Sequence, residues 1–167
     1  EGSGSRTFLQ GQTSADVQQA EEGHPLPACW LDATGRVQAL LEIRMDATGA
    51  DVLVLAGAVD AVSQGFDRVI FPADRVRLKG TRQQRRQELL VQGQPMEPFN
   101  VCWTEDEPNQ SDRFPASEAA NTNQLDRWRL EQGWPLSAGE LDGTTNPFEL
   151  GLSPWVHLNK GCYLGQE

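Results

Sequence analysis

The sequence lacks long apolar runs and has little positive charge. No hydrophobic stretch approaches the ~20 residues that a membrane-spanning helix needs, and no basic segment followed by an apolar one opens the chain as a signal peptide would. Lysine and arginine total 14 residues against 24 aspartates and glutamates, which gives a net charge of −10. Because phosphate contacts need concentrated positive charge, we expect no direct nucleic-acid binding and no membrane association.

Cysteine and histidine are also scarce. The three cysteines (Cys29, Cys102 and Cys162) form no CxxC pair, and the two histidines come with no partner motif. This pattern argues against a disulfide framework and against a zinc site, so no metal site is predicted. It favours a reducing compartment, either the cytoplasm or, in a eukaryote, an organelle matrix or stroma.

The length and hydrophobic content of the chain suffice for a folded core. A chain of 167 residues with 38% hydrophobic content can bury roughly 70% of its unfolded surface without a disulfide or metal. Strand-like and helix-like segments are mixed without regular alternation. The expected fold is therefore α+β, with a mixed, mainly antiparallel sheet and helices packed on one face of it.

Local patterns place the expected elements. Period-two alternation and short apolar runs predict strands at 28–31, 36–45, 51–55, 75–78, 88–91 and 100–103, with 51–55 central and a hairpin turn at 32–35. Helices are predicted at 59–70, at 125–133 and after Ser14, which is expected to cap a short helix ending at Gly23. Residues 7–13 are expected to form an apolar pair followed by a turn.

Composition divides the chain into three parts. Residues 104–124 are rich in aspartate, glutamate, asparagine, serine and proline, which predicts a polar, flexible loop. Residues 1–103 are interpreted as an N-terminal α+β half, and residues 125–167 as its continuation.

The last eight residues, KGCYLGQE at 160–167, combine a cation, a thiol, a phenol, an amide and a carboxylate around two glycines. No hydrophobic periodicity accounts for such a run, so a functional loop is the first hypothesis. A lysine near a cysteine favours the thiolate, as Lys160 would for Cys162. The alternative, a tight loop whose cysteine is simply buried, is equally compatible with the composition.

Other residues of this run suit a flat, polar ligand. Gly161 and Gly165 allow the backbone to approach a ligand closely, and Gln166 can both donate to and accept from a heteroaromatic amide edge. Tyr163, together with the nearby Trp155, could stack on a flat ring.

The run strongly resembles the KGCYxGQE motif of the YgfZ family, whose members are related to the glycine-cleavage T-protein. Four further segments resemble that family in the same order along the chain: FLQGQTSADV at 8–17, DATGRV at 32–37, RLEQGWP at 129–135 and NPFELGL at 146–152. Together they span nearly the whole chain.

The resemblance implies a clover-leaf, T-protein-like fold. This chain would cover its central part, without the C-terminal barrel domain and perhaps without the first strand. Residues 1–103 and 125–167 would then form the region that binds tetrahydrofolate or another reduced folate. The resemblance also implies support of iron–sulfur cluster assembly or repair, with client or assembly proteins as partners and an indirect effect on tRNA modification.

Site residues follow from the same resemblance. Cys162 would be the functional thiol, with Lys160 in its loop, and Glu149 would contact the pterin edge. The other folate-binding candidates are Gln10, Gln12, Arg129, Asn146, Gly161, Tyr163, Gly165, Gln166 and Glu167. For Glu149 a salt bridge within a helix or loop is the alternative.

The hairpin departs from the T-protein branch, where an aspartate pair that includes the catalytic carboxylate follows the hairpin glycine. This chain has Gln38 and Ala39 at the matching place, and neither side chain can act as a general base. We therefore expect folate binding without aminomethyl transfer. Two alternatives stay open: a one-carbon transferase using a carboxylate such as Asp32 or Asp46, and an acidic protein-interaction module.

Overall fold

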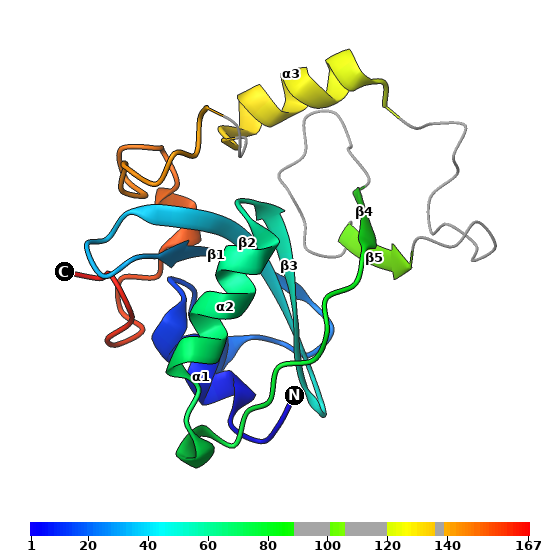
Figure 1. Ribbon diagram of the computed structural model, residues 1–167. Coiled ribbons are helices and arrows are strands. Elements are labelled where there is room, and N and C mark those ends of the chain that lie inside the picture. Colours follow the sequence, from blue (N-terminus) through cyan, green and yellow to red (C-terminus); the bar gives the residue numbers. More distant parts are fainter. Residues whose placement is uncertain (89–100, 106–119, 136–138) are drawn as a thin grey trace.

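The computed structural model describes residues 1–88, 101–105, 120–135 and 139–167. These residues form an α+β fold around a three-stranded antiparallel sheet of order β1-β2-β3, made of β1 (Pro25–Leu31), β2 (Val37–Asp46) and β3 (Gly49–Ala56). The described helices are α1 (Ser5–Gln12), α2 (Val59–Val69) and α3 (Thr122–Gln132). Figure 1 shows α1 and α2 beside the sheet, and α3 apart from them. The expected α+β class and antiparallel sheet are confirmed.

The sheet is covered on both faces, which explains why its central strand β2 is buried nearly throughout. Ala39, Leu41 and Ile43 face α1 and α2 and form one core with Phe8 and Phe66. Residues 141–163 contribute to a second core, which consists of Cys29, Leu31, Val37, Leu40, Ala56, Leu141, Leu152 and Trp155. The segment that carries the terminal motif therefore packs directly on the sheet.

A two-stranded ribbon, β4 (Gln84–Glu88) with β5 (Val101–Glu105), extends the fold beyond the sheet. It is tied to β2 by Glu42, whose side chain is 6% exposed. The Glu42 carboxylate accepts hydrogen bonds from Arg86 at 2.8 and 3.0 Å and from Trp103 Nε1 at 2.9 Å. A buried charge is tolerated here because it is paired and hydrogen-bonded.

Most predicted strands and helices are confirmed. The hairpin joining β1 to β2 turns at Gly35, whose φ is 76°, and α2 ends before Pro72 as its proline predicts. Helix α3 ends at Gly133 in the left-handed conformation. The strands expected at 88–91 and 100–103 overlap β4 and β5, although 89–91 and residue 100 lie outside the described residues. The loop expected at 104–124 falls largely on residues 106–119, which are also outside them.

Two predictions near the N-terminus were wrong. The segment predicted as an apolar pair and a turn forms α1, because Phe8 and Leu9 are buried in the core on one face of a helix. Ser14 caps no helix, and only a 3₁₀ turn, Val17–Gln19, follows it. Its hydroxyl instead accepts from Cys29 N at 2.7 Å and donates to Trp155 O at 2.6 Å.

Two strand predictions also need correction. The strand at 51–55 is not central: β3 pairs only with β2 among the described strands. Residues 75–78 do alternate, but they join neither described sheet, and Arg77 pairs its backbone with Glu1 instead. Within the described ranges, no helix has the length and apolarity needed to cross a bilayer.

Candidate functional site

The terminal motif is anchored to the C-terminal end of α1. Lys160 Nζ donates to Gln10 O and to Thr13 O, each at 2.5 Å, and Lys160 O accepts from Gln10 Nε2 at 2.8 Å. Leu164 N donates to Gly11 O at 3.0 Å. Carbonyls at the end of a helix lack partners within it, and its partial negative charge favours a cation. The motif therefore supplies the capping groups of α1.

Burial affects the charge of this lysine. Lys160 is 9% exposed, and desolvation lowers its pKa to about 8, with Asp16 acting in the opposite direction. Its ammonium lies 4.7 Å from the centre of the Tyr163 ring. The Tyr163 ring is itself half-buried against the second core, and desolvation raises its pKa.

The other end of the motif packs against the β1–β2 hairpin. Gly165 has a φ of 77°, and a Cβ added there would lie 2.3 Å from Asp32 O. A Cβ on Gly35 would likewise lie 2.9 Å from Gly165 O. Two glycines thus allow backbone to pack on backbone. Figure 1 shows the C-terminus beside this hairpin.

Cys162 lies between these two anchors and is exposed. The Lys160 ammonium is directed toward the carbonyls of α1, and no contact between it and the Cys162 thiol is found in the described part of the chain. Cys29 offers a contrast: it is fully buried, and burial raises its pKa to about 12, partly offset by its hydrogen bond with Ser14. Of the two cysteine side chains that the structure describes, one is therefore accessible and the other is not.

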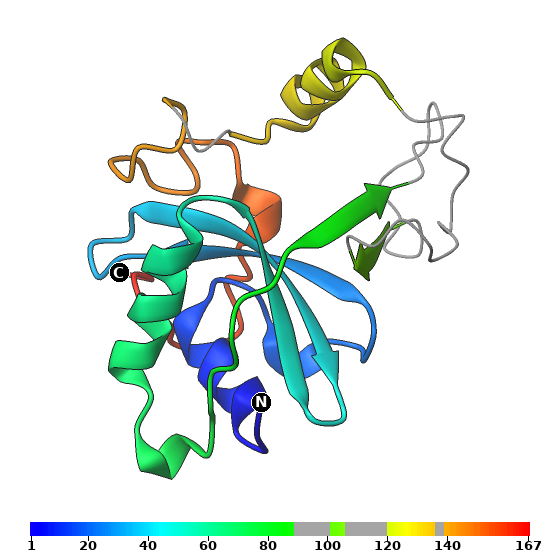
Figure 2. The same ribbon diagram turned by 45° about the vertical axis from the view of Figure 1, so that its right-hand side comes forward.

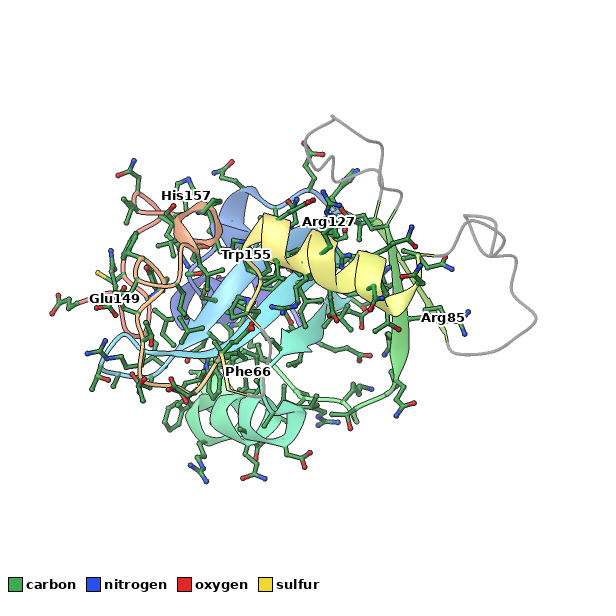
Figure 3. The ribbon with its side chains drawn as sticks, turned by 90° about the horizontal axis from the view of Figure 1, so that it is seen from above. Phe66, Arg85, Arg127, Glu149, Trp155 and His157 are labelled. Atoms are coloured by element: carbon green, nitrogen blue, oxygen red, sulfur yellow. The ribbon has the colours of Figure 1, made fainter. Side chains whose placement is uncertain are left out.

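Asn146 and Glu149 form a second group near the hairpin, where Glu149 lies close to Arg36. Asn146 Oδ1 accepts from Phe148 N and Glu149 N, while Glu149 Oε2 accepts from Asn146 N at 3.1 Å, a reciprocal pattern typical of a helix start. Glu149 Oε2 also lies 3.4 Å from Arg36 Nη1. Glu149 thus forms a salt bridge, but its partner is 113 residues away in the sequence and does not belong to the same loop, as the predicted alternative required. Figure 3 shows Glu149 pointing outward.

The hairpin residues differ in accessibility. Ala39 is fully buried, whereas Gln38 is half-buried and its amide donates to Asp32 Oδ2 at 3.3 Å and to Gly143 O at 3.4 Å. Desolvation would raise the pKa of Asp32, but hydrogen bonds from Thr34 and Arg36 outweigh it and hold that pKa below its usual range. Gln38 and Ala39, the two positions matched to the aspartate pair in the sequence comparison, thus offer an amide and a buried methyl group, and the nearest carboxylate, that of Asp32, is held by hydrogen bonds.

The other candidates lie in different places. Gln10 supports Lys160 and also bonds Asp16 and Gln18 N. Gln12 borders a separate cavity near Phe71, and Arg129 in α3 holds Trp134 O at 2.7 Å and Glu140 at 2.7 Å. None of the contacts found for Gln12 or Arg129 among the described residues joins them to the motif.

The remaining candidates are the last two residues of the chain and Trp155. Gln166 and Glu167 are exposed, and Gln166 Oε1 accepts from Tyr163 N at 3.3 Å. Trp155 is 5% exposed and packs edge-on against Trp134 at 5.3 Å, so it serves as core and offers no free face for stacking.

Two contributors were missed by sequence reasoning. Ser14 joins β1 to the segment before the motif through Cys29 N and Trp155 O, and its position after α1 gave only a capping signal. Arg36 meets a carboxylate 113 residues away, a separation that no local pattern reveals. No protein-family model matches the chain, and a search of curated proteins gave no match.

Proposed function

We propose that this chain belongs to a folate-binding accessory protein, with a T-protein-like fold, that supports iron–sulfur cluster assembly or repair in client enzymes. Cys162 supplies the functional thiol, and the region around Arg36, Gln38 and Glu149 binds the pterin of a reduced folate. An effect on tRNA modification is indirect, through such clients.

The observation that carries the proposal is the placement of Cys162. Its loop is fixed on one side by Lys160 at α1 and on the other by Gly165 at the hairpin, while the thiol stays exposed. A structural cysteine is usually buried, as Cys29 is. Cys162, in contrast, is exposed on a loop that is held at both ends. A thiol that is held in place and open to solvent fits a reaction with an external partner.

The residues near the hairpin fit a pterin. Pterins present a row of N–H donors, and Glu149 Oε1 has no hydrogen-bond partner among the described residues, while Oε2 is oriented by Asn146 N and Arg36. The Gln38 amide is held close by. A bound reduced folate would supply one-carbon carrier chemistry, and the residues of this chain would hold its ring by hydrogen bonds to a fixed carboxylate.

The transferase alternative is less well supported. The Asp32 carboxylate is hydrogen-bonded by Thr34, Arg36 and Gln38, and its lowered pKa makes it a weak base. Asp46 lies at the other end of β2, where it is bound by Thr48 and Gly49 in the next turn. Both carboxylates hold turns, and neither is placed to take a proton from a substrate near Gln38.

Calorimetric titration with tetrahydrofolate under anaerobic conditions tests the proposal. We expect saturable binding that weakens at least about tenfold in Glu149→Gln, because a charge-assisted hydrogen bond contributes roughly 1.5–3 kcal/mol. The matched control is Glu22→Gln, which changes an exposed glutamate away from the hairpin. Equal affinity of the two variants would show that Glu149 does not contact the folate. The absence of saturable binding by the unaltered chain would contradict folate binding itself.

A further inference from the structure

The two histidines of the chain are far apart in the sequence but line the same cavity. This cavity, of about 500 Å³, lies between the segment that follows α1 and the segment that precedes the terminal motif, beside the first residues of β1. We call it the β1 cavity. Residues from the segment 15–27 form one wall, and residues 154–157 form the other. Small-molecule sites have volumes of roughly 300–1,000 Å³, so the size of the cavity suits a compact ligand.

Arg6 of α1 holds the first wall in place. Its guanidinium Nη1 donates to Val17 O at 2.6 Å and to Ala20 O at 3.0 Å, and it also donates to Gln18 O at 3.3 Å. Val17 is itself fully buried in the first core. Because three carbonyl groups of one short loop share a single cation, the loop has little freedom to collapse into the cavity.

Ser14 joins the second wall to the rest of the fold. Its carbonyl oxygen accepts from His157 N at 2.9 Å, and its hydroxyl donates to Trp155 O at 2.6 Å. Pro154 restricts the backbone of the same wall within a 3₁₀ turn. Figure 2 shows this segment, in orange, on the side of the sheet away from α2. Both walls are therefore in place before a ligand arrives, which reduces the ordering cost of binding.

Two prolines of β1 make this edge of the sheet unsuitable for a further strand. Cys29 N donates to the Ser14 hydroxyl and Cys29 O accepts from Ser14 N, so Cys29 directs both backbone groups away from β2. Alternate residues of a strand direct these groups to the same side. Pro27 and Pro25 therefore face that side as well, and a proline has no N–H to donate to a ladder. A small molecule suits the cavity better than an extended peptide.

The lining of the β1 cavity combines an apolar surface with negative charge. Leu26, Trp155 and Val156 are among its apolar side chains. Of the described residues that line it, the charged ones, Asp16 and Glu21, are both acidic, and none is a lysine or an arginine. The apolar surface favours an apolar ligand body, and the carboxylates favour a cationic group. An amine with an apolar body matches both.

Asp16 is the better placed of the two carboxylates. Its Oδ1 accepts from Gln10 Nε2 at 3.1 Å, and no partner for its Oδ2 is found among the described residues. Glu21, in contrast, lies 3.4 Å from His24 Nδ1. The same Gln10 amide donates to Lys160 O at 2.8 Å. The Asp16 carboxylate is thus held in place with one oxygen open to a ligand, next to the anchor of the terminal motif.

We propose that the β1 cavity binds an organic amine, in which an ammonium group is carried by a compact apolar body. The apolar body contacts Leu26 and Val156, and the ammonium group donates a charge-assisted hydrogen bond to Asp16. The cavity lies at the opposite end of β1 from the hairpin, so this site is separate from the region proposed for folate and does not depend on it.

Three probes with similar apolar bodies and different charges test the proposal: 2-phenylethylamine, 2-phenylethanol and phenylacetate. Each is titrated into the ¹⁵N-labelled chain, and amide chemical shifts are followed by NMR. We expect saturable shifts at residues 15–24 and 155–157, with the amine bound at least about fivefold more tightly than the alcohol and the carboxylate bound most weakly. Equal affinities, shifts confined to other residues, or no saturable binding of the amine would overturn the proposal.

A conservative variant isolates the charge. Asp16→Asn keeps the oxygen that accepts from Gln10 and removes the negative charge, so it should weaken binding of the amine at least about fivefold and leave the affinity for 2-phenylethanol unchanged. The matched control is Asp67→Asn, at an exposed position of α2, which should change neither affinity. Unchanged amine binding in Asp16→Asn, or an equal loss of both compounds, would contradict the role of the carboxylate.

Discussion

Lys160 and Gln10 bind each other reciprocally: the lysine ammonium donates to the Gln10 carbonyl at 2.5 Å, and the Gln10 amide donates to the Lys160 carbonyl at 2.8 Å. The two residues are 150 positions apart in the sequence. Their contact makes the end of α1 and the start of the terminal motif one structural unit. Loss of either side chain should therefore loosen the loop that carries Cys162.

Replacing Lys160 by methionine should destabilise the fold by about 1–3 kcal/mol near neutral pH, because the carbonyls of Gln10 and Thr13 lose their donor while partly buried. Urea unfolding of the unaltered chain and of Lys160→Met measures the difference. An exposed lysine, Lys79, gives the control: Lys79→Met should change stability by less than about 0.5 kcal/mol. A comparable loss of stability in both variants would contradict the anchoring role of Lys160.

The same variant tests the lowered pKa of Lys160. The folded chain releases this proton at a pKa of about 8 and the unfolded chain near 10.5. Between these values the unfolded state binds more protons, so the contribution of Lys160 to the free energy of unfolding rises with pH. The stability gap between the unaltered chain and Lys160→Met should widen by on the order of 1 kcal/mol from about pH 7 to about pH 9.5. A constant gap would mean an ordinary lysine pKa.

Gly165 should be less tolerant of a side chain than Gly161. Both have positive φ, 77° and 90°, but a Cβ meets Asp32 O at 2.3 Å only at Gly165, and at Gly161 it meets nothing within 4 Å. Gly161→Ala should cost about 1 kcal/mol from backbone strain alone, and Gly165→Ala at least about 2 kcal/mol, because the motif must also move off the hairpin. Thermal or urea unfolding compares them, and equal losses would show that the close approach contributes nothing.

The two described thiols should react at very different rates. Cys162 is exposed, whereas Cys29 is buried with its pKa raised to about 12. Since the thiolate is the nucleophile, alkylation by iodoacetamide near pH 8 should be at least about a hundredfold faster at Cys162. Peptide mass spectrometry over time gives both rates, and Cys162→Ser identifies the fast phase. Similar rates would make Cys162 an ordinary structural cysteine.

The β4–β5 ribbon should depend on Arg86. Its side chain is 15% exposed and pairs with the buried Glu42, so Arg86→Met leaves a buried charge without its main partner, at a cost of about 3 kcal/mol. Arg85→Met, at the neighbouring exposed position, should cost less than about 0.5 kcal/mol. Chemical unfolding and the fluorescence of Trp103 follow the effect. Stability restored by Glu42→Met in the Arg86→Met background would confirm the cause.

Local patterns in the sequence predicted much of the fold. The apolar alternation of β2, the hairpin glycine Gly35 and the glycine stop at Gly133 each specify local geometry directly, and all three predictions are confirmed. Predictions failed where contacts between residues far apart in the sequence determine the local structure. Phe8 and Leu9 are helical because a helix buries both side chains against the sheet. The Ser14 hydroxyl does not cap a helix because it donates a hydrogen bond to Trp155 O.

The candidate site was likewise only partly predictable from the sequence. The motif itself marked Lys160, Cys162 and Gly165 as unusual, but their different roles as anchor, exposed thiol and packing position depend on α1 and the hairpin. A lysine two residues from a cysteine predicts a thiolate, yet the carbonyls of α1 compete for its ammonium and hold it. The partnership of Arg36 with Glu149 has no sequence signal at all.

The central claim is folate binding without aminomethyl transfer, and one titration tests it most directly. Tetrahydrofolate is added anaerobically while the fluorescence of the five tryptophans is followed, and the same sample is then given an aminomethyl donor and assayed for methylene-tetrahydrofolate. The account predicts a saturable fluorescence change and no product above the protein-free rate. The absence of a saturable response, or turnover of the donor by the bound folate, would contradict it.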